Sequence, residues 1–194
     1  MANQFVFDES FIEAFVSKPG GHLVLGKRLK PMSTWHVLQL QYVQSPLAAG
    51  GAVEWSDLWL AVRICGTSFP ESVRRPRFAA LRLAWARGWR RLSREVSAFE
   101  AYAGDYMSSP EIQSEKTSTQ SARLPDLDSL LQEVAMYRKM SGCSREEAWN
   151  VPTGELSWMN TAWARMNGAK FTIITPLERA MIARLKAAKL TKGK

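Results

Sequence analysis

Residues 56–66 read SDLWLAVRICG, an apolar run set between a helix-start signal and a helix-stop signal. Ser56 is a favourable N-cap residue, and Asp57 places a carboxylate in the first turn, where it suits the positive end of the helix dipole. Gly66 is a natural end, because glycine readily adopts the conformation that follows a last helical turn. The body of the run is apolar nearly all round, so we expect this helix at the centre of a hydrophobic core.

Helix signals also dominate on the N-terminal side of this run. A short helix is predicted over residues 8–16, and HLVLGKRL at residues 22–29 suggests a short extended segment or a hairpin. KPMSTWHVLQLQYVQSP at residues 30–46 predicts a helix that Ser33 or Thr34 caps. The apolar side chains expected near one face of it are Trp35, Leu38, Tyr42 and Val43.

Residues 74–95, RRPRFAALRLAWARGWRRLSRE, carry eight arginines and no carboxylate before Glu95. Plotted at about 100° per residue, they predict the start of a long helix with an apolar, core-facing side and a basic side. The apolar side comprises Phe78, Leu81, Trp85, Trp89, Leu92, Val96 and Phe99, and the basic face comprises Arg87, Arg90, Arg91 and Arg94. Three interpretations of the basic face stay open: a solvated surface, phosphate contacts with nucleic acid, and a seat for an acidic protein segment. Binding to a membrane surface is a weaker interpretation, since the apolar side carries residues that a globular core would use.

The composition changes at residues 104–125, GDYMSSPEIQSEKTSTQSARLP, which are polar and rich in serine and threonine. This stretch predicts a linker or a long surface loop. Beyond it, helix signals are Asp126 as a cap, an S-x-x-E capping box at Ser144 and Glu147, a helix from Thr153 to Gly168, an extended stretch at 171–174, and a second capping box from Thr175 to Glu178. We therefore predict a mainly α protein: an N-terminal helical bundle at 1–103, a polar linker at 104–125, and a C-terminal helical module at 126–194 that ends in a basic tail.

The bulk properties restrict the setting of the protein. The chain has 194 residues and a formal charge of +8, which permits an acidic partner without identifying one. The N-terminal residues carry acids where a signal peptide would carry basic residues, and no apolar run approaches the roughly 20 residues that span a bilayer. We expect a cytosolic protein that does not bind membranes.

The sequence offers little for catalysis. It contains no HExxH, GxSxG, P-loop or GxGxxG pattern, and the acids Asp57, Glu146, Glu147 and Glu178 are explained as helix-start residues. His36 is expected to be a structural histidine, and Cys65, among apolar neighbours, an inert core thiol. We predict no enzymatic activity, no metal and no cofactor.

Tryptophan is abundant, with eight in the chain. Trp149, Trp158 and Trp163 fall within a predicted module of about 70 residues, too small to bury all of them fully. The pattern indicates either a partner-binding surface or a small core that depends on tryptophan. The candidate protein-binding residues are Trp158, Met159, Trp163 and Met166.

Two stretches resemble a known group of proteins. GKRLKPMSTWHVLQLQYVQSP at residues 26–46, followed by SDLWLAVRICG, resembles the N-terminal part of small helical proteins encoded in tail-gene clusters of bacteriophages and prophages. MSGCSREEAWNVPTGELSWMNTAWARMNGAKFTIITPLE at residues 140–178 is similar to their C-terminal part. These proteins look like tail assembly chaperones of long-tailed phages. The resemblance covers residues 23–66 and 127–180, and it includes neither the arginine-rich segment nor the linker.

The resemblance implies a non-enzymatic helper in the host cytoplasm that is absent from the mature virion. Its partners would be the tape-measure protein, which it keeps soluble, and the tail-tube protein; self-association is left open. The alternatives are a structural or connector protein of the phage tail or neck, and a non-specific nucleic-acid-binding protein that uses the arginine face.

Overall fold

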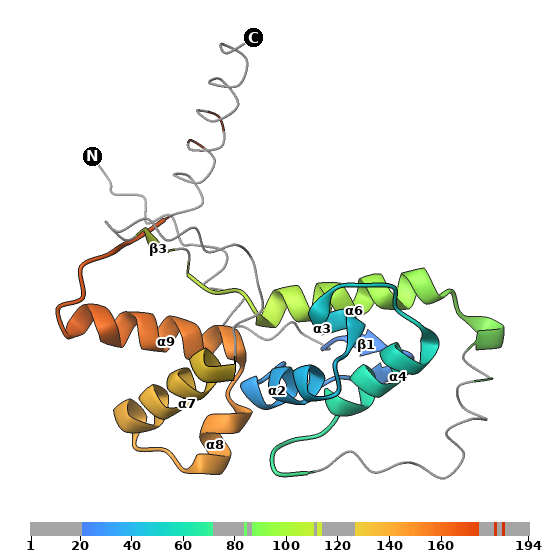
Figure 1. Ribbon diagram of the computed structural model, residues 1–194, viewed down its shortest axis with the longest axis horizontal. Coiled ribbons are helices and arrows are strands. Elements are labelled where there is room, and N and C mark those ends of the chain that lie inside the picture. The colour runs from blue at the N-terminus through green and yellow to red at the C-terminus, as the bar shows by residue number, and fades with distance from the viewer. Residues whose placement is uncertain are drawn as a thin grey trace.

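The computed structural model describes residues 21–71, 84, 87–110, 112–113, 127–174, 181 and 184. This part of the chain is mainly helical, and the helices form an elongated arrangement (Figure 1). The elements are β1 (Leu23–Val24), β2 (Lys27–Arg28), α2 (Thr34–Tyr42), α3 (Pro46–Ala49), α4 (Trp55–Ile64), α6 (Leu92–Tyr106), β3 (Ile112–Gln113), α7 (Leu127–Ser141), α8 (Arg145–Asn150), α9 (Thr153–Met166) and β4 (Thr172–Ile173). The predictions for residues 8–16 and for the second capping box lie outside the described residues.

Helix α4 lies at the centre of the main core, as its sequence predicts. Leu58, Val62 and Ile64 are buried, and so is Cys65 just after the helix. The predicted N-cap, Ser56, is wrong, because the helix begins two residues earlier in a capping box of Glu54 and Asp57. The Glu54 N–H donates to Asp57 Oδ2 at 2.9 Å, so Asp57 acts as the third helical residue of this box.

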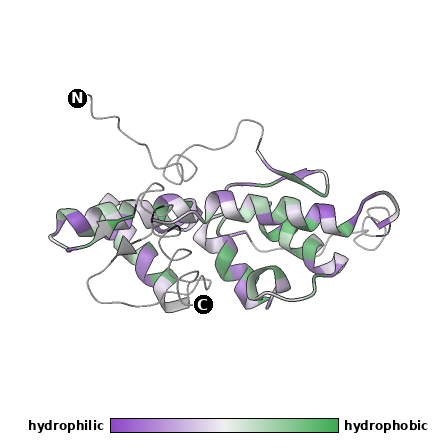
Figure 2. Ribbon diagram, turned by 90° about the horizontal axis from the view of Figure 1, so that it is seen from above, coloured by the Kyte–Doolittle hydropathy of each residue, from purple (hydrophilic) through white to green (hydrophobic). Residues whose placement is uncertain are grey.

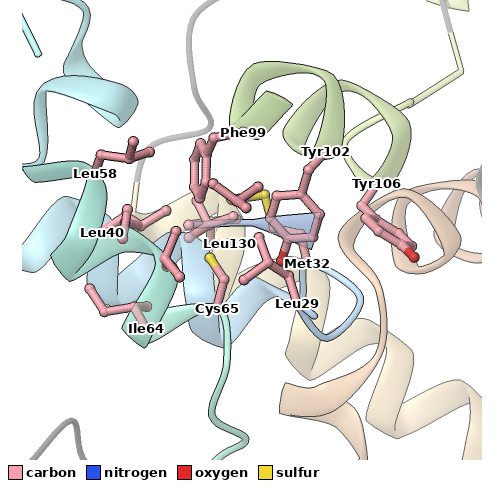
Figure 3. Packing of buried hydrophobic residues seen from close by; sticks show 14 residues of the cluster. Leu29, Met32, Leu40, Leu58, Ile64, Cys65, Phe99, Tyr102, Tyr106 and Leu130 are labelled. Atoms are coloured by element: carbon pink, nitrogen blue, oxygen red, sulfur yellow. The ribbon is translucent and has the colours of Figure 1, made fainter. Parts of the chain in front are cut away.

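The main core joins α4 to elements from most of the described chain. Figure 3 shows Phe99 and Tyr102 of α6 converging with Cys65 and with Leu130 of α7. The buried Tyr102 hydroxyl donates to the Lys30 carbonyl oxygen at 2.8 Å, so the phenol is satisfied. Each large apolar side chain buried here contributes roughly 1.5–3 kcal/mol through the hydrophobic effect. Coloured by hydropathy, the helices carry both hydrophobic and hydrophilic residues along their length, as expected of helices that bury one side (Figure 2).

Helix α2 buries two sides, and the predicted single apolar face is therefore wrong in part. Val37 and Leu40 pack into the main core, whereas Trp35 and Leu38 pack against a second cluster. Tyr42, expected on the buried face, is 82% exposed. A helix held between two clusters does not follow the pattern of a helix with one buried stripe.

The second cluster connects α2 to the C-terminal helices. Its buried members are Val134, Ala148, Trp149 and Leu156, and partly buried residues packed against it include Trp35, Leu38, Phe69 and Tyr137. The Trp35 and Phe69 rings meet edge to face with centroids 5.0 Å apart, and Phe69 stacks on Trp149 at 6.0 Å. The Thr153 N–H donates to the Met32 carbonyl oxygen at 2.9 Å, next to an isolated bridge between Ser33 and Pro152. The parts of the chain on either side of the predicted linker thus contact each other directly.

The linker region contains more order than its composition suggests. Helix α6 continues to Tyr106, past the predicted boundary at 103, and β3 pairs antiparallel with β4 so that Ile112 faces Ile173. The extended stretch predicted at 171–174 is confirmed by β4, and the hairpin at 22–29 is confirmed by β1 and β2. The division into two modules stays a prediction.

The long arginine-rich helix is the clearest error of the sequence interpretation. Residues 87–89 are helical, but Arg91 has an extended backbone, with φ −93° and ψ 124°, and serves as the N-cap of α6. Trp89, predicted to face the core, is 81% exposed. Leu92, Val96 and Phe99 still face the core, while Phe78, Leu81 and Trp85 lie outside the described residues. The break at Arg90 and Arg91 interrupts the helical periodicity on which the prediction of one apolar side depended.

Candidate protein-binding surface

Helix α9 is held firmly at its start, and this fixes which side it buries. The Thr153 backbone N–H and hydroxyl both donate to the Met32 carbonyl oxygen. Further along, the Asn160 side-chain amide donates to the Glu133 carbonyl oxygen of α7 at 3.0 Å. Leu156, Asn160 and these anchors place one side of α9 against the rest of the protein.

The opposite side of α9 carries an apolar stripe. Met159, Ala162, Trp163 and Met166 are spaced i, i+3, i+4 and i+7, which places them within about 100° on the helix. Met159 is 36% and Met166 86% exposed, Ala162 is exposed, and Trp163 is half-buried. These four residues are called the α9 stripe below.

Trp158 does not belong to the α9 stripe. Only 8% of it is exposed, because it lies one residue, and therefore about 100°, away from Met159 on the buried side. Of the four candidate binding residues, the structure thus brings Met159, Trp163 and Met166 together on one side and places Trp158 apart.

Helix α9 itself contributes two charged side chains, Glu155 and Arg165. Glu155 lies one turn before Met159, and partial burial raises the pKa of its carboxyl above the usual value. Arg165 is exposed next to Met166. Methionine side chains can adjust to irregular apolar surfaces, and the Trp163 indole adds a large apolar area. This side of α9 is therefore suited to an apolar partner rather than to a charged one.

Leu131 is an exposed apolar residue that was not among the candidate binding residues. Leu131 of α7 is exposed, whereas its neighbour Leu130 is fully buried in the main core. The signal was present in the adjacent leucine pair, because consecutive helical residues point about 100° apart and only one of them faces a given neighbour.

The four candidate arginines do not form the predicted basic face. Arg90 Nη1 pairs with Glu95 Oε1 at 2.6 Å, and Glu95 is buried. Arg87, Arg91 and Arg94 are exposed and form no ion pair with another described residue. The structure therefore separates Arg90 from the other three.

The two residues expected to be structural are confirmed as such. His36 is buried, its Nδ1 accepts the Ser33 backbone N–H at 3.0 Å, and its Nε2–H donates to the Thr67 carbonyl oxygen at 2.7 Å. Burial lowers the pKa of this imidazole below its usual value of 6.5. Burial also raises the pKa of the Cys65 thiol to about 12, which keeps it protonated and unreactive.

No helix among the described residues is long and apolar enough to cross a membrane. In the same part of the chain, no three His, Cys, Asp or Glu side chains gather in a way that could hold a metal ion. Comparison with known proteins adds no relative, since no protein family, no curated protein and no solved structure matches this chain.

Proposed function

We propose that this protein is a non-enzymatic tail assembly chaperone of a long-tailed phage, and that the α9 stripe binds an apolar helical segment of the tape-measure protein. The observation that carries the proposal is the stripe itself: Met159, Trp163 and Met166 gather on one side of a helix whose other side is firmly packed. The client class comes from the sequence resemblance in residues 23–66 and 127–180.

The chemistry of the α9 stripe suits reversible capture of a helix. An amphipathic helix lays apolar residues at i, i+3, i+4 and i+7 against a complementary surface, which is the spacing that α9 presents. Burying three such side chains favours binding by on the order of a few kcal/mol. The entropy lost on association offsets part of this gain. Modest affinity of this size favours a helper that releases its client when tail-tube subunits arrive.

The described residues also support a binding role over a catalytic one. His36 is occupied at both ring nitrogens, and the Cys65 thiol is buried with a raised pKa. Neither group is placed to act as a base or a nucleophile on a bound substrate.

The decisive experiment is co-expression with the tape-measure and tail-tube proteins of the same genome, followed by affinity recovery at moderate salt. Soluble tape-measure protein should be recovered only when this chain is present. The double variant Met159→Glu, Met166→Glu should reduce that recovery at least tenfold, because two carboxylates would have to be desolvated against an apolar client.

The control is Tyr42→Glu, which places a carboxylate at the end of α2 on a residue about as exposed as Met166. Equal loss in the control and in the double variant would remove the α9 stripe from the proposal. Co-sedimentation of the protein with purified virions would instead identify a structural component of the particle.

A further inference from the structure

The turn of the β1–β2 hairpin is fixed against the start of α6. The Leu25 backbone N–H donates to Glu95 Oε2 at 2.6 Å, while the other carboxylate oxygen of Glu95 pairs with Arg90. A Cβ placed on Gly26 would lie 3.1 Å from Arg90 Nη2, so the turn and the Arg90 side chain touch. Strand β1 and helix α6 are in contact and lie next to each other in Figure 1.

This contact gathers cations from two separate parts of the chain. Lys27 and Arg28 follow the turn and are exposed on β2, and Arg87, Arg91 and Arg94 are exposed around the start of α6. Glu95 is the one carboxylate in residues 84–99, and it is already engaged by Arg90 and Leu25. Their own segment therefore offers the exposed arginines no free carboxylate, and they form no ion pair with another described residue.

An exposed indole lies within this basic group. Trp89 is 81% exposed and stands between Arg87 and Arg91 in the sequence. The helix break at Arg90 and Arg91 is what separates Trp89 from the core-facing side of α6. The set is called the Arg–Trp surface below and consists of Lys27, Arg28, Arg87, Trp89, Arg91 and Arg94.

We propose that the Arg–Trp surface binds single-stranded nucleic acid, with a base stacked on the Trp89 indole and the flanking phosphates contacted by Arg87, Arg91 and Arg94. Exposed aromatic rings among basic residues are the common means of binding single strands without sequence preference, since every base has a stacking face. Lys27 and Arg28 extend the positive field along the hairpin and favour a chain of phosphates over a single anion.

The composition of the surface favours a nucleic acid over other acidic partners. Five of its six members are cations, whereas binding to a lipid surface depends on a larger apolar area. An acidic protein segment would pair with the arginines but would leave the Trp89 ring without a flat partner.

The Arg–Trp surface and the α9 stripe are distant from each other. Figure 1 shows the start of α6 at one end of the long axis and α9 at the other. The inference therefore goes beyond the proposed function and does not depend on it.

The test uses the full chain and a fluorescein-labelled 20-nucleotide oligothymidylate, with binding followed by fluorescence anisotropy at 50 and 200 mM NaCl. Three phosphate contacts on a single strand predict that the affinity falls roughly 20-fold between these salt concentrations. The variant Trp89→Ala should bind about tenfold more weakly, and Trp89→Phe should retain much of the affinity, because stacking survives in the phenyl ring. Tyr42→Ala, which removes a similarly exposed ring on α2, should bind as the natural chain does.

A charge-matched pair of variants separates a site from general attraction. Replacing Arg87, Arg91 and Arg94 by glutamine should lower the dependence of log affinity on log salt by about two. Replacing the exposed Arg138, Lys139 and Arg165 by glutamine removes the same charge from α7 and α9 and should change this slope little. Circular dichroism and thermal unfolding of each variant identify losses that come from misfolding. If a triple variant fails to fold, it is replaced by the three single Arg→Gln variants, each of which should lower the slope by about 0.7.

Three outcomes would overturn the proposal. The first is no binding at 50 mM NaCl, and the second is equal binding by Trp89→Ala and the natural chain. The third is tighter capture by phosphatidylglycerol vesicles or by a polyglutamate peptide than by the oligonucleotide, which would assign the surface to a membrane or to an acidic protein.

Discussion

Asn150 and Phe69, which are far apart in sequence, are joined by two hydrogen bonds between a side chain and a backbone. The Phe69 N–H donates to Asn150 Oδ1 at 3.0 Å, and the Asn150 side-chain amide donates to the Phe69 carbonyl oxygen at 3.2 Å. This pairing fixes the segment after α4 to the end of α8, beside the stack of Phe69 on Trp149.

Replacing Asn150 by alanine should lower the free energy of unfolding by about 1–3 kcal/mol, because it leaves both backbone groups of Phe69 without these partners. Urea unfolding followed by circular dichroism measures the change. Asn167→Ala is the matched control: its amide bonds to the Trp163 carbonyl within an exposed helix end, so its loss should have little effect. Equal effects in the two variants would deny the Asn150–Phe69 pairing a structural role.

A second prediction concerns Leu130, which belongs to α7 but is buried in the main core with α4 and α6. Leu130→Ala should cost about 2–5 kcal/mol, since a fully buried leucine leaves a cavity. Because Leu130 comes from the C-terminal side of the predicted linker and is buried among residues of the N-terminal side, we expect one cooperative unfolding transition at a lower urea concentration. Two transitions, only one of which shifts in the variant, would show that the predicted modules unfold independently.

The two tryptophans of α9 should respond differently to mutation. Trp158→Ala should lower the free energy of unfolding by about 3–5 kcal/mol, because Trp158 is buried. Met166→Ser, on the exposed side, should change stability by no more than about 0.5 kcal/mol. Trp163→Ala should lower the free energy of unfolding by an amount between these two, because Trp163 is half-buried. Thermal unfolding of the three variants checks the order, and a stability loss in Met166→Ser as large as that in Trp158→Ala would contradict the burial of α9 described above.

The stability of the protein should decrease in mild acid through His36. Burial and, to a smaller extent, the charge of Lys30 keep the pKa of His36 below 6.5, although the Thr67 carbonyl oxygen acts in the opposite direction. Between the unfolded and the folded pKa, the unfolded chain binds more protons at this position. The contribution of His36 is therefore fully present above about pH 6.5 and is lost as the pH falls toward the folded value.

The measurement is urea unfolding at pH 7.5 and pH 5.5 for the natural chain and for His36→Gln. The variant cannot titrate at this position, so its loss of stability between the two pH values should be smaller. The difference between the two chains isolates His36 from carboxyl groups such as Glu133, whose pKa burial raises. An identical pH dependence in the two chains would contradict the prediction.

Local signals in the sequence were read correctly where short-range chemistry decides the structure. The Ser144–Glu147 capping box, the hairpin at 22–29 and the burial of α4 all depend on residues close together in the chain. The structural role of His36 was also predicted, although its bond to Thr67, 31 positions away, could not be.

The errors arise where a distant contact overrides the local pattern. Leu25 and Glu95 are 70 positions apart, and their hydrogen bond ties the first turn of α6 to the hairpin. The local helical pattern does not indicate that a helix begins there. The exposure of Trp89 follows from that break. Likewise, α2 contacts two clusters on different sides, and only the tertiary arrangement determines which apolar residues face which cluster.

The antiparallel pairing of Ile112 with Ile173 has a topological consequence. The stretch from 112 to 173 contains α7, α8 and α9, and its first and last residues lie side by side in paired strands. Such a stretch has the geometry of an insertion, because its two ends can be joined to a host chain without stretching either. Its entry and exit thus form one attachment. The burial of Leu130 in the main core, the contacts with α2 and the bonds to Phe69 hold the stretch further along its length, between its two ends.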